Sequence, residues 1–243
     1  MELIQYAVLL SSVFIGAFIA FKFKRISDQT TKLLISFSGA YLFSITVLHL
    51  IPETFNNENN LHTGLFVLIG FFLQILLEQL SKGIEHGHKH LNESIPISIL
   101  VGLCIHSFIE GMPLGIHHHH HHHHHHHIHS HVNNSLLSAI ALHKIPVSMV
   151  LTHMLLQSNM GKAKVLMLII FFSLTSPMGL FISHYMSNVS FYFQEISAVV
   201  IGMFLHISTT ILFESSEGHR FNSRKAIAII VGAGIAIAGA FLI

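Results

Sequence analysis

The chain alternates long apolar stretches with short polar ones. Each apolar stretch has about 18 to 23 residues, enough for an α-helix to cross the ~30 Å hydrocarbon core of a bilayer. The polar stretches between them are too short to form a soluble domain. We therefore predict an all-α integral membrane protein in which residues 1–243 make one transmembrane domain. Its eight helices are expected roughly at residues 4–21, 33–51, 61–80, 95–116, 135–157, 164–184, 194–213 and 226–243.

The Lys and Arg residues in the connections indicate the orientation, because short cytoplasmic loops carry an excess of them. All fall in the first, third, fifth and seventh connections, and none in the second, fourth and sixth. This places both termini outside. With one helix more or fewer, the Lys and Arg residues would no longer all fall on one side of the membrane. We expect a multi-pass protein of the cell (inner) membrane. The residues are Lys22, Lys24, Arg25, Lys32, Lys82, Lys89, Lys162, Lys164, Arg220, Arg224 and Lys225.

Composition agrees with a membrane protein and excludes other classes. Hydrophobic residues make up 51% of the chain and charged residues only 9%, which is outside the range of soluble domains. The formal net charge of +1 leaves no basic surface for a nucleic-acid partner. A single cysteine, Cys104, excludes an intramolecular disulfide and a thiolate metal cluster. The partner expected from composition is therefore the lipid bilayer and not nucleic acid.

The fourth predicted helix carries the clearest candidate for chemistry. His106 and Glu110 are four residues apart and therefore lie on one face of that helix. An ionised Glu inside the bilayer is costly unless it is paired. A divalent cation held by an imidazole nitrogen and a carboxylate oxygen is an efficient partner. The alternative is a His–Glu hydrogen bond that joins two helices, and we favour the metal site over it.

The fifth predicted helix adds a third candidate ligand, His143, at the depth of this pair. Pro146 is expected to kink the helix beside it, and water or Ser107 can complete the coordination. Lys144 is unusual here because an ammonium repels a cation. We expect it to pair with Glu110 when the site is empty or to occupy the place of a second metal. A Lys that extends to the membrane surface fits less well, this far from either helix end.

Other polar residues lie nearer the helix ends. At the outer end of the second helix, His49 and Glu53 are candidates for the outer approach to the site, although an interfacial role explains them equally well. Solvated helix ends likewise explain some of the residues at the inner side. The candidates for an inner exit are His206, Glu214, Glu217 and, more weakly, Glu78.

Two segments are rich in histidine. The fourth connection (117–131) lies outside in the predicted orientation, and Glu85-His86-Gly87-His88-Lys89-His90 lies inside. A purification tag normally stands at a terminus, so a native metal-collecting segment is preferred. Such runs bind zinc, nickel or copper with little geometric demand. The outer histidines are His117, His118, His119, His120, His121, His122, His123, His124, His125, His126, His127, His129 and His131.

These motifs resemble the ZIP family of divalent-metal (zinc/iron) transporters. The resemblance rests on His-Ser-Phe-Ile-Glu-Gly at 106–111, His-Lys-Ile-Pro at 143–146 and His-Leu-Ile-Pro-Glu at 49–53. It implies eight helices with both ends outside, a transport site of His106, Glu110 and His143, and an outer approach at His49 and Glu53. It also implies uptake into the cytoplasm by an elevator-like alternating-access motion, and a homodimer.

The chain departs from the binuclear version of that family pattern. In that version the fifth helix carries an acidic or amide residue after its first ligand and a Glu or His four residues on, where this chain has Lys144 and Val147. Ser107 also replaces the Asn that commonly follows the His of the fourth helix. The resemblance therefore implies the mononuclear type, in which Lys144 stands in place of the second ion.

The function expected is transport of a divalent cation and not catalysis. Zn²⁺ is the favoured substrate, and Fe²⁺, Mn²⁺ or Cd²⁺ suit the same ligands. One alternative is an intramembrane zinc hydrolase, which would hold an activated water on His and acidic ligands, but no His-Glu-x-x-His motif occurs. The other is a metal-efflux carrier, because ligand chemistry does not set the direction of transport.

Overall fold

The computed structural model describes residues 2–23, 27–55, 60–81, 97–115, 126–158, 160–185, 192–213 and 223–242. Within these ranges the chain is helical and contains no strand. The helices are α1 Glu2–Lys22, α2 Asp28–Ile45, α3 Ile51–Thr54, α4 Asn60–Ser81, α5 Ile97–Gly111, α6 His126–Gln157, α7 Lys162–Tyr185, α9 Phe193–Phe213 and α10 Ser223–Leu242.

In the described chain, seven helical segments are long and apolar enough to cross a membrane. The eighth is α5, which continues as a 3₁₀ turn at Met112–Gly115. Together the two span about 30 Å at ~1.5 and ~2.0 Å per residue, which matches the hydrocarbon core. The α-helix gives way to the tighter turn because Pro113 has no N–H and its ring crowds the carbonyl of the preceding turn. The prediction of an all-α membrane protein with eight spanning helices is confirmed.

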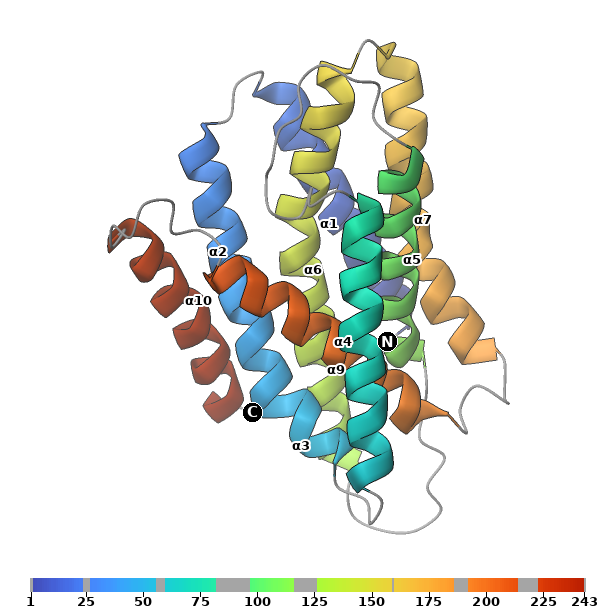
Figure 1. Cartoon of the computed structure of the whole chain (residues 1–243), viewed down its shortest axis with the longest axis vertical. Coiled ribbons are helices and arrows are strands. Elements are labelled where there is room, and N and C mark those ends of the chain that lie inside the picture. The colour runs from blue at the N-terminus through green and yellow to red at the C-terminus, as the bar shows by residue number, and fades with distance from the viewer. Residues whose placement is uncertain are drawn as a thin grey trace.

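Consecutive spans run in opposite directions (Figure 1). The chain therefore begins α1 and finishes α10 toward the same end of the molecule. The basic side chains Lys22, Lys32, Lys162 and Arg224 belong to helix ends at the opposite end of the molecule. This arrangement matches the parity expected from the Lys and Arg residues of the connections.

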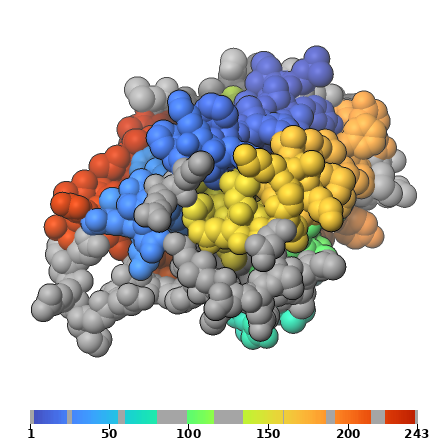
Figure 2. Space-filling view, turned by 90° about the horizontal axis from the view of Figure 1, so that it is seen from above, coloured from blue at the N-terminus to red at the C-terminus, as the bar shows by residue number. Residues whose placement is uncertain are grey.

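The spans form two groups. The first, called the site bundle, consists of α1, α5, α6 and α7: α1 packs on α6 and α7, and α5 packs on α7. The second, called the flanking bundle, consists of α2, α4, α9 and α10: α4 packs on α9, and α2 packs on α9 and α10. The two bundles meet where α2 contacts α6 and where α4 contacts α5. Seen from above, α6 lies among α1, α2 and α7, and α10 covers the far side of α2 (Figure 2).

Glycines bring helices of one bundle into backbone contact. In the flanking bundle, a Cβ added to Gly70 of α4 would collide with the carbonyl oxygen of Val199 on α9, and one added to Gly202 of α9 would collide with that of Val67 on α4. In the site bundle, Gly111 makes the same close approach to α7. Small residues of this kind permit the tight packing on which membrane helices depend in the absence of a hydrophobic driving force.

The second span is bent. Between α2 and α3 it forms a π-helical turn, Thr46–Leu50, in which the N–H of Ile51 bonds to the carbonyl of Thr46. The turn is wider than α-helical because Pro52 follows it, and proline neither donates a hydrogen bond nor tolerates the carbonyl four residues before it. Single π-helical turns often mark functional sites, and this one contains His49.

The sixth helix begins earlier than the apolar pattern predicts. It starts at His126, so residues 126–131 of the expected outer loop form the first turns of α6. No proline or glycine interrupts residues 126–135, and the helical register therefore continues back beyond the apolar part. Residues 116–125, with most of the histidine tract, and the inner cluster at 85–90 lie outside the described residues.

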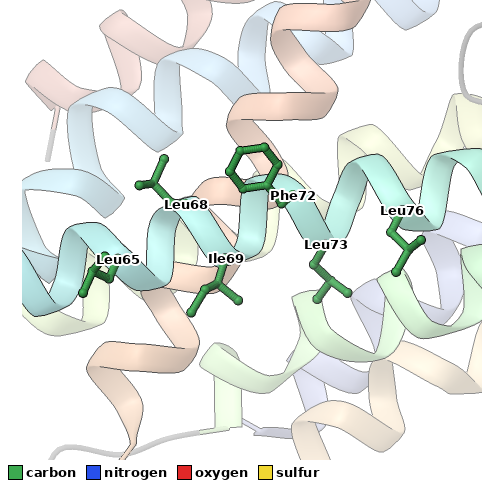
Figure 3. A pocket seen from close by; sticks show the side chains of 6 residues that line it. All are labelled: Leu65, Leu68, Ile69, Phe72, Leu73 and Leu76. Atoms are coloured by element: carbon green, nitrogen blue, oxygen red, sulfur yellow. The ribbon is translucent and has the colours of Figure 1, made fainter.

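The outer surface of the bundle is apolar, as expected for contact with lipid. A groove along α4 is lined by Leu65, Leu68, Ile69, Phe72, Leu73 and Leu76 (Figure 3). No polar side chain lines it, so this groove is unrelated to the polar residues considered as a site. The candidate site residues His106, Glu110 and His143 are buried inside the molecule instead.

Candidate metal site

The centre of the site is the His106–Glu110 pair on α5. Its Nε2 and Oε2 atoms are 3.2 Å apart, as the four-residue spacing predicts. Both residues are buried, with exposed fractions of 5% and 1%. The pair therefore places a carboxylate and an imidazole together in a region shielded from water, where an uncompensated charge is costly.

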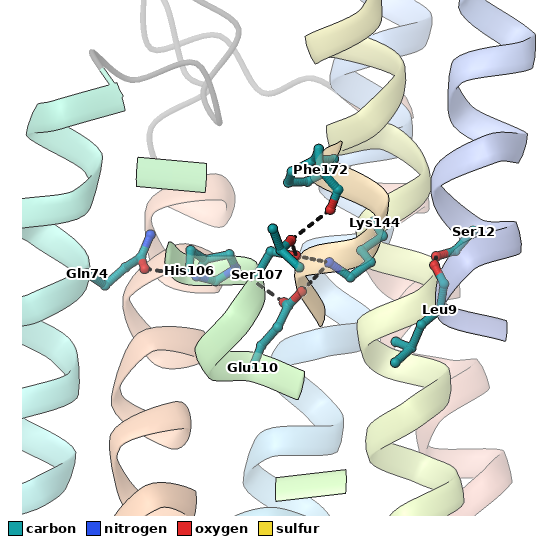
Figure 4. Close-up of polar contacts among 9 residues, drawn as sticks. Leu9, Ser12, Gln74, His106, Ser107, Glu110, Lys144 and Phe172 are labelled. Carbon is teal, nitrogen blue, oxygen red and sulfur yellow. Dashed lines mark hydrogen bonds and ion pairs between the residues drawn. The ribbon is translucent and has the colours of Figure 1, made fainter. Parts of the chain in front are cut away.

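Lys144 of α6 compensates that carboxylate. Its Nζ lies 2.5 Å from Oε1 of Glu110 and donates a hydrogen bond to Ser107 Oγ at 2.6 Å (Figure 4). The ring of Phe172 is also near, with its centroid 5.3 Å from Nζ, which adds a cation–π contact. Of the alternatives considered for Lys144, the structure shows the pair with Glu110, and the side chain does not extend to the surface.

Ser107 links three helices at this point. Besides accepting from Lys144 of α6, its Oγ lies 2.9 Å from the hydroxyl of Thr175 on α7. The Thr175 hydroxyl is also 2.7 Å from the carbonyl oxygen of Phe172 in its own helix. The serine thus holds the ammonium in place, and α5, α6 and α7 are fixed relative to one another around the charged pair.

His106 has a second partner on its other ring nitrogen. Its Nδ1 lies 3.0 Å from Oε1 of Gln74 on α4 (Figure 4). Gln74 is fully buried. The imidazole is therefore held from both sides, by the carboxylate of its own helix and by an amide of the flanking bundle.

His143 lies next to Lys144 on α6 and is also buried, with an exposed fraction of 3%. Its Nδ1 has no hydrogen-bond partner among the described residues, and it lies within electrostatic range of Glu110, His106 and Lys144. Within the described part of the chain, no group of three or more His, Cys, Asp or Glu side chains is arranged to hold a metal ion. The structure thus joins His106 and Glu110 directly and leaves Nδ1 of the neighbouring His143 without a partner among the described residues.

Pro146 lies inside α6, as predicted. It cannot donate to the carbonyl of Leu142, so one backbone hydrogen bond of the helix is missing beside His143. The local backbone can therefore bend more easily at the point where His143 and Lys144 project.

The residues of the predicted outer approach lie on the bent second span. His49 lies in the π-helical turn, where its Nε2 is buried and has no hydrogen-bond partner in the described chain. Glu53 follows in α3. A buried imidazole nitrogen without a partner costs free energy, so the position of His49 is one that packing alone does not explain.

Two of the candidate exit residues contact each other across helices of the flanking bundle. His206 Nε2 of α9 lies 2.6 Å from Glu78 Oε2 of α4, and the His206 ring stands edge-on to Phe71 with centroids 4.9 Å apart. Glu214 and Glu217 lie outside the described residues. Glu78, the weakest candidate from the sequence, is therefore the direct partner of His206.

Comparison with known protein families decides the class of the protein. The sequence model of the ZIP zinc transporter family matches residues 92–240, which is more than half of the chain. The chain belongs to the ZIP zinc transporter family. A search of curated proteins found no sequence that matches it. The matched region covers α5 to α10 and so includes His106, Glu110, His143 and Lys144.

Membership of the ZIP family settles the broad function. The protein is a multi-pass membrane transporter of divalent metal cations and not an enzyme. The hydrolase alternative considered from the sequence is therefore wrong. In such a transporter the bound metal is cargo and not a catalytic cofactor.

Sequence reasoning missed two residues at the site of this ZIP transporter: Gln74, which contacts His106, and Thr175, which contacts Ser107. A signal for Gln74 was present, because an amide in the middle of an apolar span must find a hydrogen-bond partner. Its position one turn before Glu78 also places both on one face of α4. Thr175 gave no such signal, since threonine can bond to its own helix, as it also does here.

Proposed function

We propose that this ZIP family member moves Zn²⁺, or a divalent ion with similar ligand preference, into the cytoplasm by alternating access. The observation that carries the proposal is the buried His106–Glu110 pair, whose nitrogen and oxygen are 3.2 Å apart. Two ligand atoms that each lie 2.0–2.2 Å from a tetrahedral zinc ion are roughly 3.3 Å apart. The pair is therefore spaced as two ligands of one ion.

His143 is the third ligand in this proposal. It lies on the neighbouring helix, is buried, and has an Nδ1 atom without a hydrogen-bond partner among the described residues. The missing backbone bond at Pro146 allows the small bend of α6 that brings this imidazole onto the ion. Water completes a tetrahedral shell, an arrangement with an open position that suits an ion that must leave again.

Lys144 favours one bound ion over two. Its ammonium already occupies the second oxygen of Glu110 and is held there by Ser107. A second ion would have to displace this ammonium, because that oxygen of Glu110 cannot bind both. When the site is empty, the same ammonium neutralises Glu110, so the empty carrier does not hold an unpaired charge in the membrane.

The two helix bundles supply the moving parts. Glycine contacts join α4 to α9 in the flanking bundle and α5 to α7 in the site bundle. One of the two clusters of buried apolar side chains lies wholly on α1, α5, α6 and α7. We propose that the site bundle moves as one body against the flanking bundle, and that residues 1–243 act as a single transport domain.

The path of the ion follows from the orientation of the chain. With the basic helix ends in the cytoplasm, an ion approaches through His49 and Glu53 and leaves through His206 and Glu78. Glu214 and Glu217, outside the described residues, stay candidates for the same exit from the sequence alone. The outer histidine tract at 117–131 collects ions before they enter. We place the protein in the cell (inner) membrane, and a homodimer is the assembly that the family resemblance implies.

Uptake by reconstituted vesicles tests this proposal. We expect purified protein to move zinc, and to different extents cadmium, iron and manganese, and we expect Glu110→Ala to abolish uptake. Glu195→Ala, which removes an acid at the start of α9, serves as the matched control and should retain it. Normal uptake by Glu110→Ala would overturn the site, and metal depletion of cells that express the protein would show that the carrier exports.

A further inference from the structure

The contact between Gln74 and His106 crosses the boundary between the two bundles. Gln74 lies on α4, which packs on α9, whereas His106 lies on α5, which packs on α7. The amide oxygen of Gln74 is 3.0 Å from His106 Nδ1, and the Gln74 side chain is fully buried. A polar amide in the middle of an apolar span is costly unless it is bonded, so this position requires a specific explanation.

The contact fixes how the imidazole presents itself to the site. An amide oxygen can only accept, so Nδ1 of His106 carries a proton, and Nε2 is the ring nitrogen that remains to bind an ion. Nε2 is the atom that faces Glu110 at 3.2 Å. Residues that accept the second N–H of a metal-ligating histidine orient the ring and raise its basicity, and their loss typically costs 10–100-fold in metal affinity.

We propose that Gln74 is a positioning residue that makes the metal affinity of His106 depend on the relative position of the two bundles. This inference rests on the proposed alternating-access transport. In the arrangement described here Gln74 supports His106, and the site holds its ion tightly. A shift of the site bundle by only about 1 Å takes the 3.0 Å contact beyond hydrogen-bond range. The imidazole then loses its acceptor, and the ion is released more easily.

A nearby feature of α4 fits this order of events. Glu78 lies one helical turn beyond Gln74 on the same face and is bonded to His206. The helix that withdraws its support from His106 therefore carries the acidic group of the next polar pair. An ion that leaves the central site meets that pair toward the cytoplasmic end of the flanking bundle.

The experiment compares zinc uptake by full-length protein in vesicles for Gln74→Leu and Gln74→Glu. Gln74→Leu removes the acceptor, and we expect the half-saturating zinc concentration to rise 10–100-fold. Gln74→Glu supplies a stronger acceptor, and we expect a lower half-saturating concentration together with a lower maximal rate, because release slows. Gln157→Leu is the control, since it removes an exposed Gln–His contact at 2.8 Å away from the site, and it should behave as wild type.

The two Gln74 variants separate positioning from a purely structural role. If Gln74 served only to pack α4 against α5, a buried carboxylate would raise the half-saturating concentration at least as much as Leu does, and that result overturns the proposal. An unchanged value in Gln74→Leu also overturns it. Should Gln74→Leu fail to fold, Gln74→Glu decides alone by the direction of its two parameters. Absence of uptake by wild type would instead refute the proposed function.

Discussion

Replacing Lys144 by Met tests whether the ammonium and the metal compete for Glu110. The ion pair is 2.5 Å long, and its two side chains are only 3% and 2% exposed. Removing one partner of such a buried pair costs about 3–5 kcal/mol, because the other charge is left uncompensated. In the zinc-bound protein the ion neutralises Glu110, so most of this penalty disappears. At ~1.4 kcal/mol per tenfold, the lower figure corresponds to roughly 100-fold tighter zinc binding.

The assay is thermal unfolding of purified protein with a chelator and with saturating zinc. We expect Lys144→Met to unfold at a lower temperature than wild type in the chelator and to gain more from zinc. Lys164→Met, at an exposed position near the start of α7, is the control and should match wild type in both conditions. Equal destabilisation of Lys144→Met with and without zinc, or weaker zinc binding, would show that Lys144 supports the metal site and does not compete with the ion.

Two further predictions concern packing within and between the bundles. Gly70→Ala should destabilise the fold by about 1–3 kcal/mol or more, because its Cβ would meet backbone of α9. Gly64→Ala is the control, since no atom lies within 4 Å of its Cβ, and it should unfold like wild type. Equal melting temperatures of Gly70→Ala and Gly64→Ala would contradict the packing argument. Tyr41→Phe removes the 2.8 Å contact of α2 with Ser138 on α6, worth about 0.5–1.5 kcal/mol. In Tyr41→Phe we expect the maximal rate of zinc uptake to change several-fold and the half-saturating zinc concentration to stay the same. If the effects of Tyr41→Phe and Ser138→Ala on that rate were additive in the double variant, the two residues would not act through a shared contact.

The parts of the fold that depend on local sequence were predictable. Spans followed from apolar length, and the His106–Glu110 contact followed from a four-residue spacing on one helix. The pairing of Lys144 with Glu110 was one of two expectations for this lysine. It forms because a buried ammonium and a buried carboxylate at the same depth each lower the free-energy cost of burying the other's charge. In each case the deciding physics acts within one helix or through charge alone.

Features that depend on helix rotation were not predictable. In a membrane protein both the lipid-facing and the packed side of a helix are apolar, so the pattern does not reveal which face meets which neighbour. The contact of Gln74 with His106 joins residues 32 positions apart. The pattern also did not show that, among the described residues, His106, Glu110 and His143 would not form a ready three-ligand group. The bend at Thr46–Leu50 depends on how the chain accommodates Pro52, which a hydropathy pattern does not describe.

The central claim is that one ion binds between α5 and α6 at His106, Glu110 and His143. The most direct test is the zinc content and X-ray absorption spectrum of a variant whose histidines in 86–90 and 117–131 are replaced by serine. We predict one zinc per chain, coordinated by nitrogen and oxygen ligands that include two imidazoles, and no bound zinc after His106→Ala. Two zinc ions per chain, or zinc that remains bound after His106→Ala, would contradict the account.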